Sequence, residues 1–237
     1  MPKHGKRYLD VTQLVDRRKA YPPQEAVAII KKTANAKFDE TIEAHLRTSA
    51  DPRHAEQQIR TGALLPHGLG KQVRVLVFAQ GDAAQAAREA GADFIGADDL
   101  IQKIDAGWVE FDITIATPDL MGRVGRLGRV LGRRGLMPNP RTGTVVQPQD
   151  IRRAVDEAKK GRVEVRLDRT AIIHAPIGKA SFEETALMEN LTALIDNINR
   201  NRPPAVKGSF IRSSYLTSTM GPSIKLDLSS LVALRAE

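Results

Sequence analysis

The sequence contains no cysteine. Disulfide bonds, thiolate metal sites and thiol nucleophiles are therefore excluded together. A chain without cysteine fits a reducing compartment, and we expect a cytoplasmic location. Aromatic residues make up only 4% of the chain. This scarcity disfavours binding of single-stranded nucleic acid through rows of stacked rings.

Long hydrophobic runs are also missing. No stretch of about 18 apolar residues is present, which is the length that a membrane-spanning helix needs. The basic segment 1–7 lacks the apolar run of a signal peptide. Neither end carries a lipidation motif. We therefore expect no membrane partner.

The sequence shows no recognisable motif of a catalytic, metal-binding or nucleotide-binding site. The five histidines are scattered, and none has the spacing of a metal-binding pair. The Walker pattern around Gly178-Lys179 fails because it requires glycine where the chain has Ile173. Gly81-Asp82-Ala83, after an apolar strand-like segment, is not the Gly-x-Gly of a dinucleotide site. The sequence predicts no catalytic residue, no metal, no cofactor and no enzymatic activity.

Basic charge is present in excess. Lysine and arginine total 36 against 28 acids, which gives a formal charge of +8. Residues 1–20 contain six basic and two acidic side chains, and residues 122–141 contain six arginines and no acid. A solvated surface would explain either segment alone. Two such segments on one chain favour a polyanionic partner, and nucleic acid is the strongest candidate.

The hydrophobic pattern predicts two domains. Apolar residues alternate in segments 38–46 and 162–172, as in strands with one wet face. Between them, buried strand-like and helix-like segments alternate, as in a parallel α/β unit. We therefore predict an α+β outer domain, residues 1–66 plus 161–237, with an inserted Rossmann-like α/β domain, residues 67–160. The glycine-bearing joints 66–71 and 159–161 would act as adjacent hinge linkers.

Several elements follow from local signals. Inside the insertion we expect a strand at 73–79, a helix at 82–90 capped by Asp82, and a helix opened by Thr117-Pro118. After it we expect an amphipathic helix at 181–199 that ends before Pro203. Strands at 206–219 and 224–228, joined by a turn, would form a hairpin.

The segment Gly122–Gly135 combines arginine with glycine. On a helical projection its arginines share one side, its leucines and valines a second, and its glycines a third. An amphipathic helix with glycines for close packing would explain this pattern. However, each interior glycine costs about 1 kcal/mol relative to alanine. We therefore expect close approach of the backbone to something anionic, with Arg133, Arg134 and Arg141 as secondary RNA contacts.

Two polar segments could read RNA. On the first, Thr41 and Glu43 point outward from a strand and suit sugar hydroxyls, while Lys37 suits a phosphate. The second, Ser213–Pro222, has six hydroxyl side chains leading into a glycine turn. Hydroxyl groups and bare amides are suited to the ribose 2′-OH and the shallow minor groove of RNA. A threonine-rich edge strand is the alternative explanation, as a rigid turn is for the proline-bearing loop 136–144.

Five motifs, in order along nearly the whole chain, resemble the signatures of the ribosomal protein L-one family, in its bacterial form. They are Phe38–Glu43, His67–Lys71, Gly135–Pro140, Ile173–Lys179 and Thr219–Pro222. The resemblance implies two α/β domains, the second inserted into the first. It also implies a non-enzymatic constituent of the large ribosomal subunit, at the mobile stalk beside the tRNA exit site.

The same resemblance implies partners and contact residues. The partners are large-subunit rRNA, other ribosomal components, exit-site tRNA whose release the protein assists, and the messenger of its own operon, which it would repress. Off the ribosome the protein would be a monomer. The implied RNA contacts are Lys37, Phe38, Thr41, Glu43, Lys179, Thr217, Thr219, Met220 and Gly221. A nucleotide-binding enzyme and a DNA-binding regulator remain as alternatives.

Overall fold

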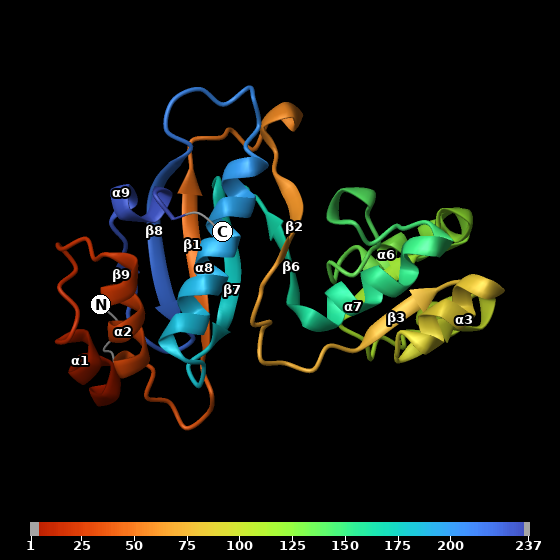
Figure 1. Cartoon of the computed structure of the whole chain (residues 1–237), viewed down its shortest axis with the longest axis horizontal. Coiled ribbons are helices and arrows are strands. Elements are labelled where there is room, and N and C mark those ends of the chain that lie inside the picture. Colours follow the sequence, from red (N-terminus) through yellow and green to blue (C-terminus); the bar gives the residue numbers. More distant parts are fainter. Residues whose placement is uncertain (1–4, 235–237) are drawn as a thin grey trace. The chain divides into compact units, whose positions relative to one another are not determined.

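The computed structural model describes residues 5–234 (Figure 1). The chain forms two compact units. Unit 1 comprises Met1–Gly70 and Val163–Glu237, and unit 2 comprises Lys71–Arg162. These borders lie a few residues beyond the sequence-based domain limits of 66/67 and 160/161. Both units mix helices with sheet, which confirms the predicted α/β class.

Unit 1 is built on an antiparallel four-stranded sheet. Its order is β7 (Ile172–Lys179), β1 (Thr41–Thr48), β8 (Ile211–Ser218) and β9 (Ile224–Lys225). A separate two-stranded sheet pairs β2 (Arg60–Leu64) with β6 (Arg162–Arg166). The predicted hairpin therefore exists, but both of its strands are shorter than expected. Pro203, Pro204 and Gly208 keep the chain irregular before β8, because prolines lack the amide that a ladder needs.

Helices cover one face of the four-stranded sheet. These are α2 (Pro23–Thr33), which contacts β8, and α8 (Glu184–Arg200), which contacts β7; α8 lies in front of the strands in Figure 1. The predicted apolar side of α8 is fully buried: Leu187, Leu191, Leu194, Ile195 and Ile198. Among its described residues, unit 1 also contains three smaller helices: α1 (Lys6–Thr12), η1 (Ala55–Gln57) and α9 (Leu228–Val232).

Strand β1 begins at Thr41, three residues later than the alternating pattern suggested. Ile42, Ala44 and Leu46 are fully buried, so the residues between them face away from the helices. The prediction that Phe38 belongs to this strand was wrong. Phe38 precedes the strand and is 54% exposed.

Unit 2 contains a parallel sheet in the order β4 (Phe94–Gly96), β3 (Val75–Phe78) and β5 (Ile113–Ala116). The four residues of β3 are all buried because both faces are covered. Leu76 and Phe78 belong to one apolar cluster, while Val75 and Val77 belong to another. The helices of this unit include α3 (Asp82–Glu89), α4 (Asp98–Asp105) and α7 (Ile151–Gly161), with single turns η4 (Pro140–Thr142) and η5 (Pro148–Asp150).

Two helices of unit 2 begin where they were predicted, but each differs from the prediction in one respect. Asp82 does not cap α3; Gly81 holds the N-cap position with φ +57° and provides no side-chain bond. The helix expected after Thr117-Pro118 is broken into η2 (Pro118–Leu120), α5 (Met121–Val124), η3 (Gly125–Leu127) and α6 (Gly128–Leu131). Repeated glycines weaken continuous helix formation, and short 3₁₀ turns replace it.

Candidate nucleic-acid interface

The face of the unit 1 sheet opposite its helices is polar. We call it the polar sheet face and define it by seven residues: Thr41, Glu43, His45, His174, Lys179, Tyr215 and Thr217. Strand register aligns Thr41 with Lys179, and Glu43 with Thr217. His45 lies between His174 and Tyr215. The register therefore brings together residues from three strands that are distant in sequence.

Thr41 connects the strands at one end of this face. The Lys179 ammonium donates a hydrogen bond to the Thr41 hydroxyl over 2.8 Å. The Thr41 amide donates to the Thr219 hydroxyl at 3.0 Å, and the Thr219 amide donates to the Thr41 carbonyl at 3.1 Å. Three of the expected contact residues are thus joined by direct hydrogen bonds.

A buried carboxylate lies under the same end of the sheet. Glu40 is 1% exposed, and it accepts hydrogen bonds from the amides of Ala36 at 2.9 Å and Met220 at 2.8 Å. A guanidinium nitrogen of Arg7 lies 3.9 Å from it. Glu40 therefore ties the loop that carries Lys37 and Phe38 to the turn after β8. Sequence reasoning placed Glu40 within a motif but gave it no role.

The turn after β8 exposes apolar surface next to these polar groups. Met220 is 50% exposed, as Phe38 is at 54%. Gly221 is confined, because a Cβ there would lie 2.4 Å from the Ser218 hydroxyl. Exposed apolar side chains beside hydroxyls and amines suit stacking on a base or a ribose.

The hydroxyl-rich strand β8 does not present all its hydroxyls to solvent. Ser214 is fully buried and Ser218 is 4% exposed, and neither hydroxyl has a hydrogen-bond partner among the described residues. Tyr215 and Thr217 alternate with them and lie on the polar sheet face. The expectation that the six hydroxyls form one RNA-reading set was therefore wrong, because the two-residue period of the strand divides them.

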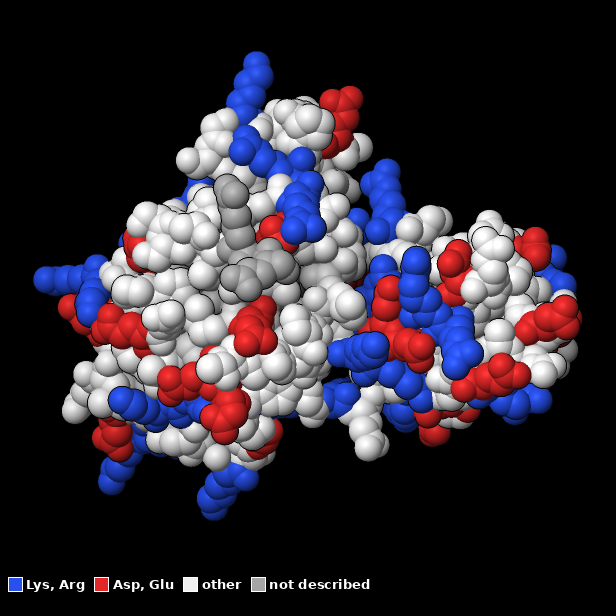
Figure 2. Space-filling model, viewed as in Figure 1, with Lys and Arg blue, Asp and Glu red and all other residues white. Residues whose placement is uncertain are grey.

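The arginine-rich segment belongs to unit 2. Arg133, Arg134 and Arg141 are exposed, but Arg133 and Arg134 follow the end of α6 and do not extend a helical arginine side. Arg123 is paired with Asp98 at 2.7 Å. Acidic and basic side chains intermingle on the visible face of this unit (Figure 2). The segment is thus exposed and basic without being a uniform cationic helix face.

Most glycines of this segment do not serve close packing as the alternative explanation required, although a Cβ on Gly132 would lie 2.4 Å from the carbonyl oxygen of Gly128. A Cβ placed on Gly122, Gly125 or Gly128 would meet nothing within 4 Å. The leucine and valine side is nevertheless buried as expected: Leu120, Val124, Leu127 and Leu131. The backbone at Gly122, Gly125 and Gly128 is therefore open toward solvent.

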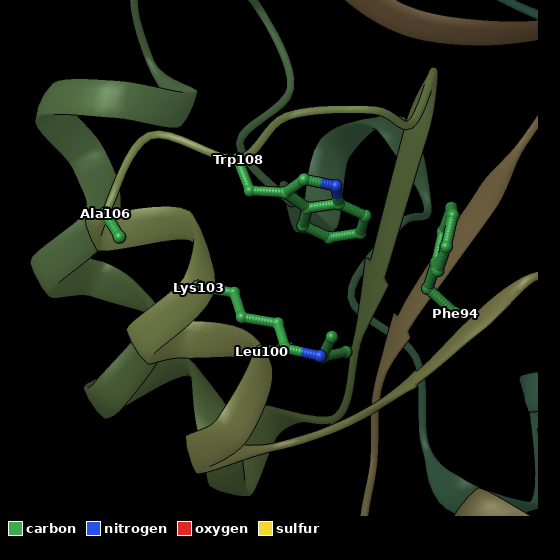
Figure 3. A pocket seen from close by; sticks show the side chains of 5 residues that line it. All are labelled: Phe94, Leu100, Lys103, Ala106 and Trp108. Carbon is green, nitrogen blue, oxygen red and sulfur yellow. The ribbon is translucent and has the colours of Figure 1, made fainter.

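A hollow of about 440 Å³ in unit 2 bears on the nucleotide-enzyme alternative (Figure 3). Phe94 and Trp108 meet edge to face there, with ring centroids 4.8 Å apart, and Lys103 supplies the one charged lining group. Phe94 begins β4 and Trp108 precedes β5, so the hollow lies at the amino ends of the strands. Ligands of open α/β sheets bind at the carboxyl ends. The hollow does not match a nucleotide site.

Within residues 5–234, no cluster of three or more potential ligand side chains is arranged to hold a metal ion. In that same range, no helix combines the length and apolar character needed to cross a membrane.

The fold and this face together define a class: a discontinuous α+β unit that displays a polar, partly basic sheet face and carries an inserted parallel α/β unit. The chain belongs to the ribosomal protein L1p/L10e family, whose model matches residues 30–222. This membership confirms the resemblance seen in the motifs. It also confirms the expected location at the cytoplasmic ribosome.

Bacterial relatives match the chain almost end to end. Three proteins named large ribosomal subunit protein uL1 illustrate this. The one from Chloroflexus aggregans is 57% identical over 236 residues, covering 99% of this chain and all of the relative. The one from Dehalococcoides mccartyi BAV1 is 55% identical over 234 residues, 99% of both chains. The one from Thermomicrobium roseum is 56% identical over 233 residues, 98% of this chain and 97% of the relative. None of these names describes a catalytic activity.

Proposed function

We propose that this protein is a non-enzymatic constituent of the large ribosomal subunit that binds the stalk rRNA through the polar sheet face of unit 1. The observation that carries the proposal is the convergence at Thr41. Thr41 is hydrogen-bonded to Lys179 and to Thr219, which come from distant segments of the chain. The neighbouring Glu40 accepts a hydrogen bond from the amide of Met220. Recognition of ribose and base edges requires polar groups on a rigid support, which a sheet provides.

Each proposed contact has a chemical role. Lys179 uses one of its three N–H donors on Thr41, which leaves two for a phosphate. Lys37 would provide a second phosphate contact from the loop that Glu40 holds. Glu43 and Thr217 lie opposite each other and would bind ribose hydroxyls or base amines.

The apolar part of the surface has a separate role. Phe38 and Met220 would stack against unpaired bases or sugars, and the amide of Gly221 lies in a turn too narrow for a side chain. Arg133, Arg134 and Arg141 of unit 2 would add phosphate contacts that strengthen binding without reading sequence.

We extend the proposal to two further roles and to the oligomeric state of the free protein. The protein would assist release of exit-site tRNA, with the two units moving about their linkers. It would bind the messenger of its own operon with the same polar sheet face. Because one face can hold only one RNA at a time, rRNA and messenger would compete, and repression would begin when rRNA is saturated. Away from the ribosome the protein would act as a monomer among other ribosomal components.

Co-sedimentation tests the proposal directly. The protein is mixed with large subunits from a bacterium that lacks its own member of the family, and the mixture is spun through a sucrose cushion. We expect stoichiometric binding to large subunits and none to small subunits. A protein that stays in the supernatant would contradict the proposal.

Competition separates the alternatives. A stalk fragment of large-subunit rRNA should displace bound RNA at far lower concentration than a scrambled RNA or duplex DNA of equal length. Preference for the duplex DNA would support the DNA-binding regulator. A thermal shift produced by free nucleotides, without RNA discrimination, would revive the nucleotide-binding enzyme.

A further inference from the structure

Four polar side chains form a row across the polar sheet face that ends at Thr217. Asp168, in the turn before β7, has a carboxylate oxygen 3.5 Å from Nε2 of His174. Nδ1 of His174 lies 2.8 Å from Nδ1 of His45, and Nε2 of His45 lies 2.7 Å from the Thr217 hydroxyl. We call this row the histidine relay. No contact of this kind is needed to hold the strands together, because backbone ladders already do so.

The short distance between the two Nδ1 atoms constrains the protons. One Nδ1 must carry hydrogen and the other must be bare, since two N–H groups cannot point at each other over 2.8 Å. Desolvation opposes ionisation of Asp168, but hydrogen bonds from Thr170, Ile172 and His174 lower the pKa of Asp168 to about 2. The ionised carboxylate, with an oxygen 3.5 Å from Nε2 of His174, favours a proton on that nitrogen.

The tautomers of the neutral pair follow from that proton. A neutral His174 with hydrogen on Nε2 has a bare Nδ1, which accepts from Nδ1–H of His45. Nε2 of His45 is then bare and accepts the hydroxyl hydrogen of Thr217. In this state the Thr217 oxygen can only accept hydrogen bonds from a ligand.

Adding one proton reverses the direction of the relay. Nδ1 of His174 becomes N–H and donates to Nδ1 of His45, and the remaining hydrogen of His45 moves to Nε2. That N–H donates to the Thr217 oxygen, which frees the hydroxyl hydrogen for a ligand. The pair holds two ring hydrogens before the change and three after it. A second added proton would set N–H against N–H, so the pair takes up only one.

We propose that the His45–His174 pair is a proton-controlled positioning device that decides whether Thr217 accepts or donates a hydrogen bond toward bound RNA. This inference rests on the proposed RNA-binding function, because Thr217 needs a ligand to address. RNA presents mainly acceptors, its phosphate and ribose oxygens, to a protein surface. The protonated relay adds both a donor and a positive charge, so RNA binding strengthens as pH falls.

The two imidazole rings differ in their exposure to solvent. The His45 side chain is 24% exposed and the His174 side chain 49% exposed. Burial, and then the nearby His174, lower the pKa of His45. Ionisation of the His45 ring is therefore disfavoured. Imidazole is the side chain that ordinarily changes charge between about pH 5 and 8.

Other charged or titratable groups face the relay from each neighbouring strand. Glu43, on β1, has a carboxylate oxygen 3.9 Å from Nε2 of His45 and favours the added charge. Arg47 lies two residues further along the same strand. On β8, Tyr215 lies opposite His45, and Lys225 of β9 lies opposite Tyr215. Of the two carboxylates, Glu43 thus lies near His45, and Asp168 lies 3.5 Å from Nε2 of His174.

The test measures RNA affinity against pH at fixed salt. Full-length protein is titrated with a transcribed stalk fragment of large-subunit rRNA between pH 6 and 8. We expect binding about three- to tenfold tighter at the acidic end, the change that one hydrogen bond produces. His174→Asn keeps a group that can accept from His45 but cannot take up a proton, so it should bind with nearly constant affinity across this range.

A matched control separates the relay from general effects of pH. His67 is an exposed histidine of unit 1 outside the sheet, and its side chain pairs with Glu189. His67→Asn should retain the wild-type pH dependence. If His174→Asn also retains it, the relay is not the source and the inference is overturned. Thermal melts of each variant establish that the fold is intact.

The tautomers can be read without RNA. Nitrogen-15 spectra of the imidazoles at pH 8 should show hydrogen on Nε2 of His174 and on Nδ1 of His45. The reverse assignment would overturn the relay even if RNA binding is normal. If the wild-type protein binds no RNA at any pH, the proposed function fails instead, and the spectra still decide whether the relay exists.

Discussion

Two backbone amides from opposite ends of the chain meet at the carboxylate of Glu40. Ala36 lies before β1 and Met220 after β8, and each donates to a different oxygen of the side chain. A buried carboxylate with two amide donors fixes both segments, since an unpaired buried amide is costly. The candidate contacts on either side of Glu40 therefore depend on a residue that does not itself face the ligand.

Replacing Glu40 tests this dependence. Glu40→Ala leaves two amides without partners and should lower the free energy of unfolding by about 2–3 kcal/mol. Glu40→Gln keeps one acceptor oxygen and should lose about half as much. RNA affinity should fall in the same order, because the Lys37 loop and the Met220 turn lose their connection. Denaturant melts and RNA titration of both variants provide the check. An alanine variant as stable as the wild type would show that the carboxylate is dispensable.

Substitutions of Thr219 and Met220 in the exposed turn should affect RNA binding more than they affect the stability of the fold. Met220→Asp changes a half-exposed side chain and should alter stability by under about 0.5 kcal/mol. It should weaken RNA binding at least tenfold, because a carboxylate would face phosphates. Thr219→Ala should weaken binding too, but it also removes the acceptor for the Thr41 amide, at a cost of about 0.5–1.5 kcal/mol.

Leu64→Asp is the matched control for the turn variants, since Leu64 is an apolar side chain of unit 1 that is 46% exposed on another strand. It should leave discrimination between stalk rRNA and scrambled RNA unchanged. Denaturant melts in which Met220→Asp is destabilised by several kcal/mol would instead identify the turn as part of the core.

Some residue positions could be predicted from the sequence, and others could not. The two-residue period placed Thr41 and Glu43 on one face of their strand, and the strand register, which the sequence did not give, brought Thr217 opposite Glu43. The same period should have placed Ser214 inside. The roles of Glu40 and the histidine relay depend on contacts across more than 100 positions, and no local pattern encodes such contacts.

At the scale of elements, continuous apolar segments were the most reliable signals. Strand β3 and helix α8 formed where their patterns indicated, because burial on defined faces determines both. Segment 118–131 did not form the single helix that its projection suggested. Its buried leucines kept their common side while the glycines allowed the backbone to alternate between α and 3₁₀ turns. Side-chain burial was thus predictable where backbone geometry was not.

The exposed arginines after α6 lead to a prediction about salt. Arg133→Ala combined with Arg134→Ala should lower RNA affinity modestly and flatten its dependence on salt. For every phosphate that the variant no longer neutralises, the log–log slope should decrease in magnitude by roughly 0.7–0.9. Discrimination between stalk rRNA and a scrambled RNA should remain, because phosphate contacts carry no sequence information.

The paired change Arg152→Ala with Arg153→Ala is the charge-matched control. Both residues are exposed on α7 of the same unit, and Arg153 already pairs with Glu157. This variant loses the same net charge and should keep the wild-type slope. If the Arg133/Arg134 variant fails to discriminate between the RNAs while its slope is unchanged, these residues read the RNA rather than its charge.

At the scale of the whole molecule, two segments of the chain connect the units. The first connecting segment, residues 66–70, is bound to unit 1 by specific contacts. The fully buried Asn190 accepts from the amide of His67 at 3.0 Å and donates to the carbonyl of Gly68 at 3.0 Å. A Cβ on Gly70 would lie 2.8 Å from the ring of Phe182. The segment up to Gly70 is therefore packed as part of unit 1, and any excision of unit 2 should begin after Gly70.

Excision of unit 2 tests architecture and recognition together. A variant in which Lys71–Arg162 is replaced by a short Gly/Ser linker retains the four-stranded sheet, the helices that cover it and the contacts of Asn190. It also retains β2 and most of β6. We expect a cooperative melt, because the division falls between compact units with separate apolar cores.

The excised variant should still select the stalk rRNA fragment over a scrambled RNA, with some decrease in affinity. The polar sheet face lies wholly within unit 1. Under the proposal, Arg133, Arg134 and Arg141 of the missing unit would contribute phosphate contacts alone. Adding Met220→Asp to the excised variant should weaken RNA binding at least tenfold, as is expected in the whole chain, because both proteins would use the same surface. If the variant melts cooperatively but no longer distinguishes the two RNAs, recognition requires unit 2. The contacts assigned to Thr41, Glu43 and Thr217 would then be wrong.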